Sequence, residues 1–485
     1  MSESFQLSAS EMRELGYRVI DMIIDHVERL PGETVGKKGS RVELETALHE
    51  PIPEFGQDPD AVLDVVENTV LSNILSTDHP RFFGFIPSPS NYVSVLADAL
   101  AAGFNVFAGT WLEGSGPAQI ELTTIDWLRQ LCGLPETSGG LFVSGGSAAN
   151  LTGLALARDL KLRELDDLTK GTIYYSDQTH ASMDRGLRVL GFKTEQIRRL
   201  ESDEEYRLPL SDLKDAVVAD RSEGKLPFCV VANAGTTSTG TVDPLPELVE
   251  FCREEDLWLH VDGAYGAAAV ISSEGRRNLE GLGEVDSVSL DPHKWLFQPY
   301  EIGCVLVRDR GLLPKSFHTL PEYLIDTRPA EEEINFYNYG IQLTRGFRAL
   351  KLWFSLKTFG LENFRKAIDR GMDLARIAEK RVRESSTVKL FSPAQMGILT
   401  YRFEPPRETD LDVDRLNERI VDALVIDGTA LVSSTILKGR TVLHMCTINP
   451  RTTLRDIHDT IDRIEAIGAR LAETSPQSRQ SDDAP

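Results

Sequence analysis

The chain is poor in cysteine, with five residues among 485, and no two of them lie close together in the sequence. An odd number of scattered cysteines offers no disulfide framework, so we expect reduced thiols and a cytoplasmic location. Neither the C-x-x-C nor the H-E-x-x-H spacing occurs, so a zinc site has no support. The sequence therefore predicts a cytoplasmic protein with no metal.

The chain also lacks a long apolar run. Its longest mainly apolar stretch, residues 96–112, is broken by one aspartate, one asparagine and two glycines, and is too short to span a bilayer. The first residues are polar and do not show the basic and then apolar order of a secretory signal. We expect no association with a membrane.

Basic residues are outnumbered, 52 against 75 acidic ones, which gives a net charge of −23. Such a balance argues against general affinity for nucleic acid or an anionic membrane. Neither a G-x-G-x-x-G nor a Walker motif occurs. The composition, 41% hydrophobic and 26% charged, is that of a globular protein. Its length predicts a large domain with a smaller one attached.

Residues 1–85 have the pattern of a helical arm. Ser8 and Glu11 have capping-box spacing, and apolar residues then recur every fourth position from Leu15 to Val27. This first helix should end at Pro31, and a second is expected over residues 61–75. Because the first helix is more amphipathic than a free tail requires, we expect the arm to pack on a partner surface.

Residues 86–350 alternate short apolar runs with helix-length segments. The runs are Leu141–Val143, Thr172–Tyr175, Phe228–Ala232, Leu257–Val261, Val288–Leu290 and Cys304–Val307. The pattern predicts an α/β fold, a mostly parallel sheet with helices on both faces. Residues 351–472 are expected to form a smaller C-terminal α/β domain of βαβ-like character, and residues 473–485 a disordered tail.

Two of the predicted strands end in reactive side chains. Asp262 follows one apolar run and Lys294 follows the next, and ligands of such sheets lie beyond the carboxyl ends of the strands. Pyridoxal phosphate needs an amine to carry it as a Schiff base and a carboxylate to keep its pyridine nitrogen protonated. A solvated lysine and a turn-forming aspartate are the ordinary alternatives. The convergence of five polar strand ends favours the cofactor site.

Other strand ends carry matching groups. Gly146, Ser147 and Ala148 open a predicted helix, whose backbone N–H groups suit an anion such as a phosphate. His180 is either a core histidine or a ring that stacks on the cofactor and reaches the substrate carboxylate. Thr237 either hydrogen-bonds near the cofactor or is merely a polar strand end.

Taken together, these motifs resemble the group II pyridoxal-phosphate decarboxylases, specifically those acting on aromatic amino acids. The matching segments are His79–Phe85, Pro117–Glu121, Ser144–Asn150, His180, Gly235–Thr237, Asp262–Ala264, Asp291–Trp295 and Arg345–Trp353. The resemblance implies the aspartate-aminotransferase fold (fold type I), a homodimer and pyridoxal 5'-phosphate as cofactor.

It also implies roles for single residues. Lys294 would carry the cofactor, Asp262 would pair with the pyridinium nitrogen and His180 would stack on the ring. Ser147 and His293 would neighbour the phosphate. Ser289 and Ala264 would complete the cofactor pocket, Ala264 being small enough to let the ring lie against its strand.

The family also uses a tyrosine in a Pro-x-Tyr-Leu setting, 29 residues after the lysine, and here this is Tyr323. Tyr323, or a histidine beside it, would protonate the substrate carbon to give the amine. Phenylalanine in its place leads relatives to an aldehyde. The charged segment that follows Tyr323 has the composition of a flexible lid.

Two positions depart from the family pattern. Asp291 stands where many members carry asparagine beside the phosphate, so it must point away, pair with a donor or be protonated. Thr344 replaces a common glycine and would alter the substrate pocket. Phe85, Pro87 and Ser88 are the other candidate substrate residues, and plain core packing is the alternative for this segment.

We therefore expect decarboxylation of an aromatic L-amino acid of the tryptophan, tyrosine, dopa or phenylalanine class. Glutamate or histidine decarboxylation and aldehyde synthesis stay open as alternatives. Transamination is disfavoured, because no C-terminal arginine motif for a second carboxylate is evident. A cofactor-binding protein without turnover is the remaining alternative.

Overall fold

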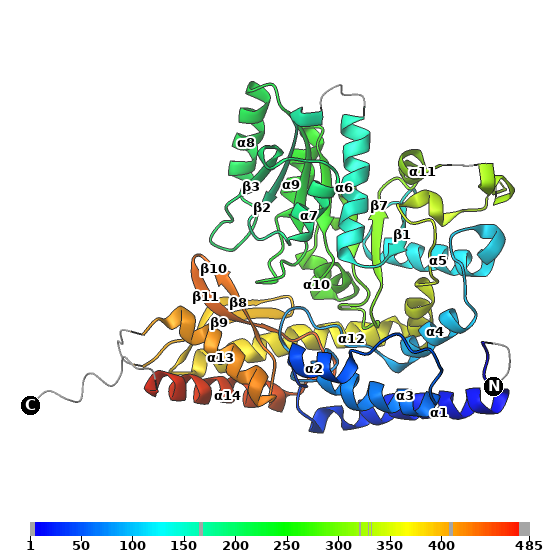
Figure 1. Ribbon diagram of the computed structural model, residues 1–485. Helices are drawn as coiled ribbons and strands as arrows, with labels where there is room; N and C mark the ends of the chain where they lie inside the picture. Colours follow the sequence, from blue (N-terminus) through cyan, green and yellow to red (C-terminus); the bar gives the residue numbers. More distant parts are fainter. Residues whose placement is uncertain are drawn as a thin grey trace, which may run out of the picture.

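The computed structural model describes residues 5–163, 168–319, 322–327, 329–330, 332–406 and 411–474. Within them the side chain of Tyr323 is not described, and residues 475–485, most of the predicted tail, lie outside them. Figure 1 shows the large sheet above, with the C-terminal segment and the N-terminal arm below it.

The N-terminal arm is helical as predicted. Helix α1 (Ala9–Arg29) begins with the predicted capping box, in which the Ser8 N–H donates to Glu11 Oε2 at 2.7 Å. It ends before Pro31, and no side chain on α1 is buried. The other elements of the arm are η1 (Leu30–Gly32), α2 (Arg41–Leu48), α3 (Pro59–Val65), η2 (Val66–Val70) and η3 (Leu71–Asn73). The second predicted helix is therefore present but irregular.

The large sheet has seven strands in the order β1-β7-β6-β5-β4-β2-β3. Their bounds are β1 (Gly139–Val143), β2 (Gly171–Ser176), β3 (Ile197–Leu200), β4 (Leu226–Asn233), β5 (Trp258–Asp262), β6 (Ser287–Leu290) and β7 (Gly303–Val307). Strands β6, β5, β4, β2 and β3 are parallel, and β7 is antiparallel to both neighbours. All six predicted strands are confirmed. The prediction missed edge strand β3, half of whose residues are arginines.

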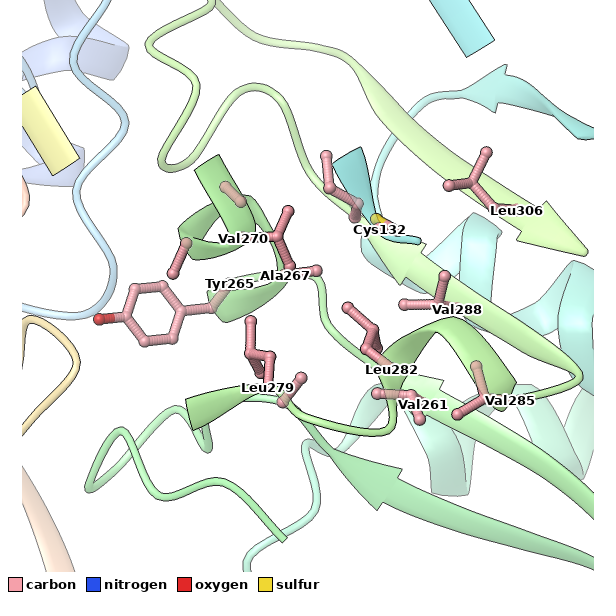
Figure 2. Close-up of a cluster of buried hydrophobic side chains, with 14 of the residues drawn as sticks. Cys132, Val261, Tyr265, Ala267, Val270, Leu279, Leu282, Val285, Val288 and Leu306 are labelled. Atoms are coloured by element: carbon pink, nitrogen blue, oxygen red, sulfur yellow. The ribbon is translucent and has the colours of Figure 1, made fainter. Parts of the chain in front are cut away.

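Helices cover both faces of this sheet, as predicted. Within β4, Val230 and Ala232 pack toward α8 (Leu210–Ser222) and α9 (Leu245–Glu254). Their neighbours Cys229 and Val231 pack toward α6 (Gly146–Leu162) and α7 (Ser182–Val189). This alternation follows from the two-residue period of a strand. Figure 2 shows part of the first core, where strand residues such as Val261 and Val288 meet Leu279, Leu282 and Val285.

Further helices surround the sheet and join the two domains. They are α4 (Tyr92–Gly103), α5 (Trp111–Leu131), α10 (Ser273–Asn278), α11 (Leu312–Phe317) and α12 (Ala349–Glu384). Short helical turns are η4 (Leu168–Lys170), η5 (Thr194–Gln196), η6 (Gly266–Ile271), η7 (Leu282–Glu284), η8 (Glu322–Thr327) and η9 (Phe336–Tyr339). The predicted helix after residue 349 is confirmed as α12.

The C-terminal segment corrects one prediction. It holds a sheet of order β10-β11-β9-β8, and every pairing in it is antiparallel. Its elements are β8 (Val388–Gln395), β9 (Ile398–Phe403), α13 (Val413–Asp427), β10 (Ser433–Leu437), β11 (Arg440–Cys446) and α14 (Leu454–Glu473). The predicted βαβ-like pattern is wrong, because two-residue turns join β8 to β9 and β10 to β11 as hairpins, and β9 pairs with β11 in antiparallel orientation. One turn is Lys438-Gly439, whose φ angles of 47° and 75° suit a hairpin turn.

None of the helices in the described part of the chain is long and apolar enough to cross a membrane. The predicted domain boundaries at residues 85 and 350 stay predictions.

Candidate active site

A cavity of about 420 Å³ lies at the carboxyl ends of the parallel strands. It brings together nine of the predicted site residues: Gly146, Ser147, Ala148, His180, Thr237, Asp262, Ala264, His293 and Lys294. A larger hollow of about 1080 Å³ between α5, α10 and α12 contains none of the predicted site residues.

Lys294 lies on the turn that follows β6. Its Nζ is 3.0 Å from Asp291 Oδ2, and its side chain is 24% exposed. Burial disfavours the ammonium form, but the carboxylates of Asp291 and Asp262 outweigh this effect, and the pKa of Lys294 is raised. In the absence of a cofactor the amine is therefore held as an ammonium ion.

Asp262 is the last residue of β5 and is buried. Its Oδ1 accepts hydrogen bonds from Ser289 Oγ and the Ala264 N–H, both at 3.2 Å. Its Oδ2 accepts one from Asn150 Nδ2 at 3.0 Å. Donors on β6, on α6 and on its own turn thus fix the orientation of this carboxylate.

The predicted anion site is the start of α6. No side chain caps this helix at Gly145, so the N–H groups of its first turn have no cap from a side chain. A Cβ on Gly146 would lie 2.8 Å from Ala264 Cβ and 2.8 Å from Asp291 Oδ2. Only glycine leaves room here, and the open helix end faces the cavity with the polarity that an anion needs.

Asp291 is buried next to this helix end. Besides the contact with Lys294, its Oδ2 lies 3.6 Å from His293 Nε2. Of the three arrangements left open by the sequence, the structure shows pairing with a donor, which is Lys294. Its negative charge lies beside the anion site, so it opposes phosphate binding unless Lys294 or another donor compensates it.

His180 lies on the exposed side of the cavity, between β2 and α7. Its Nδ1 accepts from the Ser182 N–H at 3.2 Å and lies 2.9 Å from Ser182 Oγ. Partial desolvation lowers the pKa of His180, and the nearby Asp262 charge opposes the shift. The imidazole is therefore neutral near pH 7, with its proton on Nε2.

His293 and Thr237 complete the predicted cavity wall. His293 Nδ1–H donates to the Ile302 carbonyl at 2.7 Å, and burial lowers the pKa of this histidine. Thr237 is half-buried in the turn after β4. Ser289 is not part of the wall and acts on the site through its bond to Asp262.

The predicted substrate residues lie elsewhere in the single chain. Phe85 is 64% exposed and Thr344 is exposed, whereas Pro87 and Ser88 are buried. None of the four lines the cavity that the described residues form. Their contact with substrate stays a prediction. The role of Tyr323 also stays one, because its side chain lies outside the described residues.

Several cavity residues received no role from the sequence, among them Asn150, Ser182, Asn233 and Tyr265. Asn150 lies one helical turn after Gly146, so helical spacing places both on one face of α6, and this signal was present in the sequence. Tyr265 stacks on Trp295 with ring centroids 5.2 Å apart, and its hydroxyl accepts the Gly397 N–H at 3.0 Å. No sequence signal identifies that contact with the C-terminal sheet.

The residues present fit pyridoxal phosphate. One cavity contains an amine, a fixed carboxylate and an open helix start, which match the aldehyde, the pyridine nitrogen and the phosphate of this cofactor. Within the described residues, no group of three or more potential ligands could hold a metal ion.

Comparisons with known proteins agree with this fit. The model of the pyridoxal-dependent decarboxylase conserved domain matches residues 43–404. An aromatic-L-amino-acid decarboxylase of Bacillus atrophaeus is 47% identical over 98% of this chain and 99% of its own. Tyrosine decarboxylase 2 of Narcissus pseudonarcissus is 31% identical over 93% of both chains. The Oryza sativa TDC solved with PLP and tryptamine superposes with a TM-score of 0.91 at 27% identity, covering 96% of this chain and 100% of that one.

The fold and the cavity define a fold type I protein that uses pyridoxal phosphate. The chain belongs to the pyridoxal-dependent decarboxylase family and is a carboxy-lyase of amino acids.

Proposed function

We propose that this protein decarboxylates an aromatic L-amino acid of the tryptophan, tyrosine, dopa or phenylalanine class to the corresponding amine. The observation that carries the proposal is the placement of Lys294 and Asp262 on neighbouring parallel strand ends, around a single cavity with the open start of α6. The aromatic class is supported by the relatives named above, two of which are decarboxylases of aromatic amino acids by name.

The bound cofactor supplies an electron sink for the pair of electrons left when carbon dioxide departs. Three hydrogen-bond donors keep the Asp262 carboxylate in one orientation, in which it would stabilise a positive charge on the ring nitrogen of a bound cofactor. The first turn of α6 and Ser147 bind the phosphate. Lys294 must lose the proton it shares with Asp291 before its nitrogen can act as a nucleophile.

His180 is proposed to stack on the ring and to hold the substrate carboxylate. Because its Nδ1 accepts from Ser182, its Nε2 carries the hydrogen and can donate to a carboxylate oxygen. Holding that group perpendicular to the ring aligns the breaking bond with the electron sink. Tyr323 is proposed to return the proton to the α-carbon, which gives the amine rather than the aldehyde.

The active unit is proposed to be a homodimer in the cytoplasm. Large apolar side chains of the arm are exposed in the single chain, among them Tyr17 at 67% and Met12 at 48%. Exposed apolar surface of this kind is typical of an interface. All five cysteines are buried and unpaired, which supports a reducing compartment.

The test is carbon dioxide release from a panel of tryptophan, tyrosine, dopa, phenylalanine, histidine and glutamate, with the amine identified for each. We expect kcat/KM to be highest for an aromatic member. Turnover of glutamate or histidine alone would contradict the substrate class. A protein that shows no visible absorbance after addition of the cofactor would contradict the reaction itself.

A further inference from the structure

A series of buried hydrogen bonds connects Trp258, through three intermediate residues, to the carboxylate of Asp262. Trp258 Nε1–H donates to Ser287 Oγ at 2.9 Å, and Ser287 Oγ lies 2.8 Å from His260 Nδ1. His260 Nε2 is 3.0 Å from Asn150 Oδ1, and Asn150 Nδ2 donates to Asp262 Oδ2 at 3.0 Å. Trp258, His260 and Asp262 are alternate residues of β5. Their side chains therefore lie on the same face of the strand, the face that packs against α6.

The two ends of the series of bonds fix the direction of most of them. An indole N–H can only donate, so Ser287 Oγ accepts from Trp258. A carboxylate can only accept, so Asn150 turns its amide nitrogen to Asp262 and its oxygen to His260 Nε2. His260 therefore carries a hydrogen on Nε2, and in the neutral ring its Nδ1 accepts from the Ser287 hydroxyl.

The surroundings of His260 hold this state. The ring is fully buried, and burial lowers the pKa of His260 to about 4, so it stays neutral over the physiological pH range. A Cβ on Gly153 would lie 2.7 Å from both Cε1 and Nδ1 of this ring. Helix α6 therefore packs directly against the imidazole and leaves it little room to rotate.

The series branches at Asn150. Its Nδ2 also donates to Ser182 Oγ at 3.2 Å, and Ser182 Oγ lies 2.9 Å from His180 Nδ1. One amide group thus contacts Asp262 directly and His180 through a single hydroxyl. These are the two residues proposed to bind the edge and the face of the cofactor ring.

We propose that Asn150, oriented by His260, is a positioning residue that fixes the orientation of the Asp262 carboxylate and, through the Ser182 hydroxyl, helps to hold the His180 ring in place. The inference rests on the proposed function, because it assigns to Asp262 and His180 the roles given above. In this arrangement His260, which does not line the cavity, influences the protonation of the cofactor ring indirectly, through Asn150 and Asp262.

The test follows the protonation of the ring nitrogen rather than activity alone. Wild type and variants are loaded with pyridoxal phosphate labelled with nitrogen-15 in the ring, and the chemical shift of that nitrogen is recorded against pH. Asn150→Leu removes a donor to Asp262, which favours the protonated carboxyl. We expect the ring nitrogen to move toward its unprotonated position, by an apparent shift of about one pH unit. We also expect kcat/KM to fall roughly tenfold or more.

Paired variants of His260 separate orientation from packing. Glutamine can place an amide N–H where His260 Nε2–H lies, so His260→Gln should keep a near-wild-type shift. His260→Leu fills the space without a donor and should behave like Asn150→Leu. If the leucine variants do not fold, Asn150→Asp replaces them. It keeps an acceptor for His260 but removes both donors, and it should move the ring nitrogen in the same direction.

The branch gives an independent check. Ser182→Ala removes the hydroxyl between Asn150 and His180, so we expect a raised KM with an unchanged nitrogen shift. Asn417→Leu is the matched control, because Asn417 is a fully buried asparagine of α13 that bonds the Phe403 backbone far from this network. It should leave the nitrogen shift unchanged.

The outcomes distinguish the inference from the proposed function. A changed shift in Asp262→Asn together with a wild-type shift in folded, loaded Asn150 variants overturns the inference alone. An unchanged shift in Asp262→Asn overturns the proposed role of Asp262 and the inference with it. If His260→Gln and His260→Leu change the nitrogen shift equally, His260 acts only through packing, and the inference is also overturned.

Discussion

The buried base of the site, here called the floor, and its exposed outer side, here called the mouth, are not equally complete in the single chain. On the floor, Asp262, Asn150 and His260 are buried, and each has hydrogen-bond partners. By contrast, His180 is exposed on the outer side of the cavity, and the predicted substrate residues Phe85 and Thr344 are exposed and do not line it. A site for charge stabilisation needs fixed dipoles in a water-poor setting, and the single chain provides that on the floor alone. In the proposed homodimer, we expect a second chain to supply further surfaces for substrate selection at the mouth.

Removing the amine of Lys294 from the floor of the cavity should abolish nearly all activity. We expect Lys294→Ala to lower kcat/KM by about three orders of magnitude or more, because none of the other described residues that line the cavity has an amine that could attach the cofactor. The measurement is carbon dioxide release together with the visible absorbance of the bound cofactor. In wild type, borohydride should fix the cofactor on the peptide that contains Lys294. Wild-type turnover in the variant would refute the assignment of this lysine.

Tyr323 should control the product rather than the loss of carbon dioxide. Tyr323→Phe removes the group that would return the proton to the substrate carbon, so we expect molecular oxygen to oxidise the decarboxylated substrate instead, with oxygen and water consumed and aldehyde, ammonia and hydrogen peroxide released in place of the amine. Amine, aldehyde and peroxide are quantified in parallel, and Tyr339→Phe serves as a tyrosine control outside the cavity. An unchanged yield of amine from Tyr323→Phe would argue against its role as the proton donor.

The arm tests whether a second chain completes the mouth. Tyr17→Glu places a charge on the exposed apolar side of α1, where Tyr17 is 67% exposed and makes no buried contact in the single chain. We expect the dimer to dissociate more readily, since burying an unpaired charge at an interface costs several kcal/mol. Sedimentation measures the assembly over a range of concentrations. Glu14→Gln is a conservative control on the same helix, and an unchanged dimer in Tyr17→Glu would place the interface elsewhere.

The sequence predicted the floor better than the mouth for a physical reason. Lys294 and Asp262 end apolar runs, and the topology of parallel strands brings such ends together. The roles of Asn150 and His260 depend on the packing of α6 against β5, which no local pattern records. Edge strand β3 was missed because Arg198 and Arg199 break its apolar pattern. Those arginines instead pair with Asp220 and Asp184 on the adjoining helices.

The same limit applies to the C-terminal sheet. The sequence predicted an α/β segment here, but neither its individual strands nor the order in which they pair. The Lys438-Gly439 turn, with both φ angles positive, makes β10 and β11 a hairpin and excludes a crossover between them. Phe85 and Thr344 do not line the cavity around Lys294 in the described part of the single chain, so their contact with substrate stays a prediction.

The smallest expected effect concerns the charge beside the anion site. Burial lowers the proton affinity of Lys294, yet Asp291 and Asp262 raise its pKa overall, so the free amine forms only at high pH. Asp291→Asn removes one of these charges, and the pKa of Lys294 should fall. The pH dependence of cofactor attachment should then move to lower pH by about one unit.

This raised pKa also has a consequence for stability. A lysine whose pKa is higher in the folded state stabilises that state below the unfolded value of 10.5, and loses this effect as pH rises through the folded value. Removing the Asp291 charge should therefore reduce the free energy by which protonated Lys294 stabilises the folded state at neutral pH. It should also narrow the alkaline pH range over which this stabilisation is lost. Asp98→Asn is the matched control, because Asp98 pairs with Lys351 at 3.1 Å outside the cavity. If both variants bind the cofactor with the wild-type pH profile, Asp291 does not set the state of Lys294. The departure from the family's asparagine would then have no electrostatic effect on the floor.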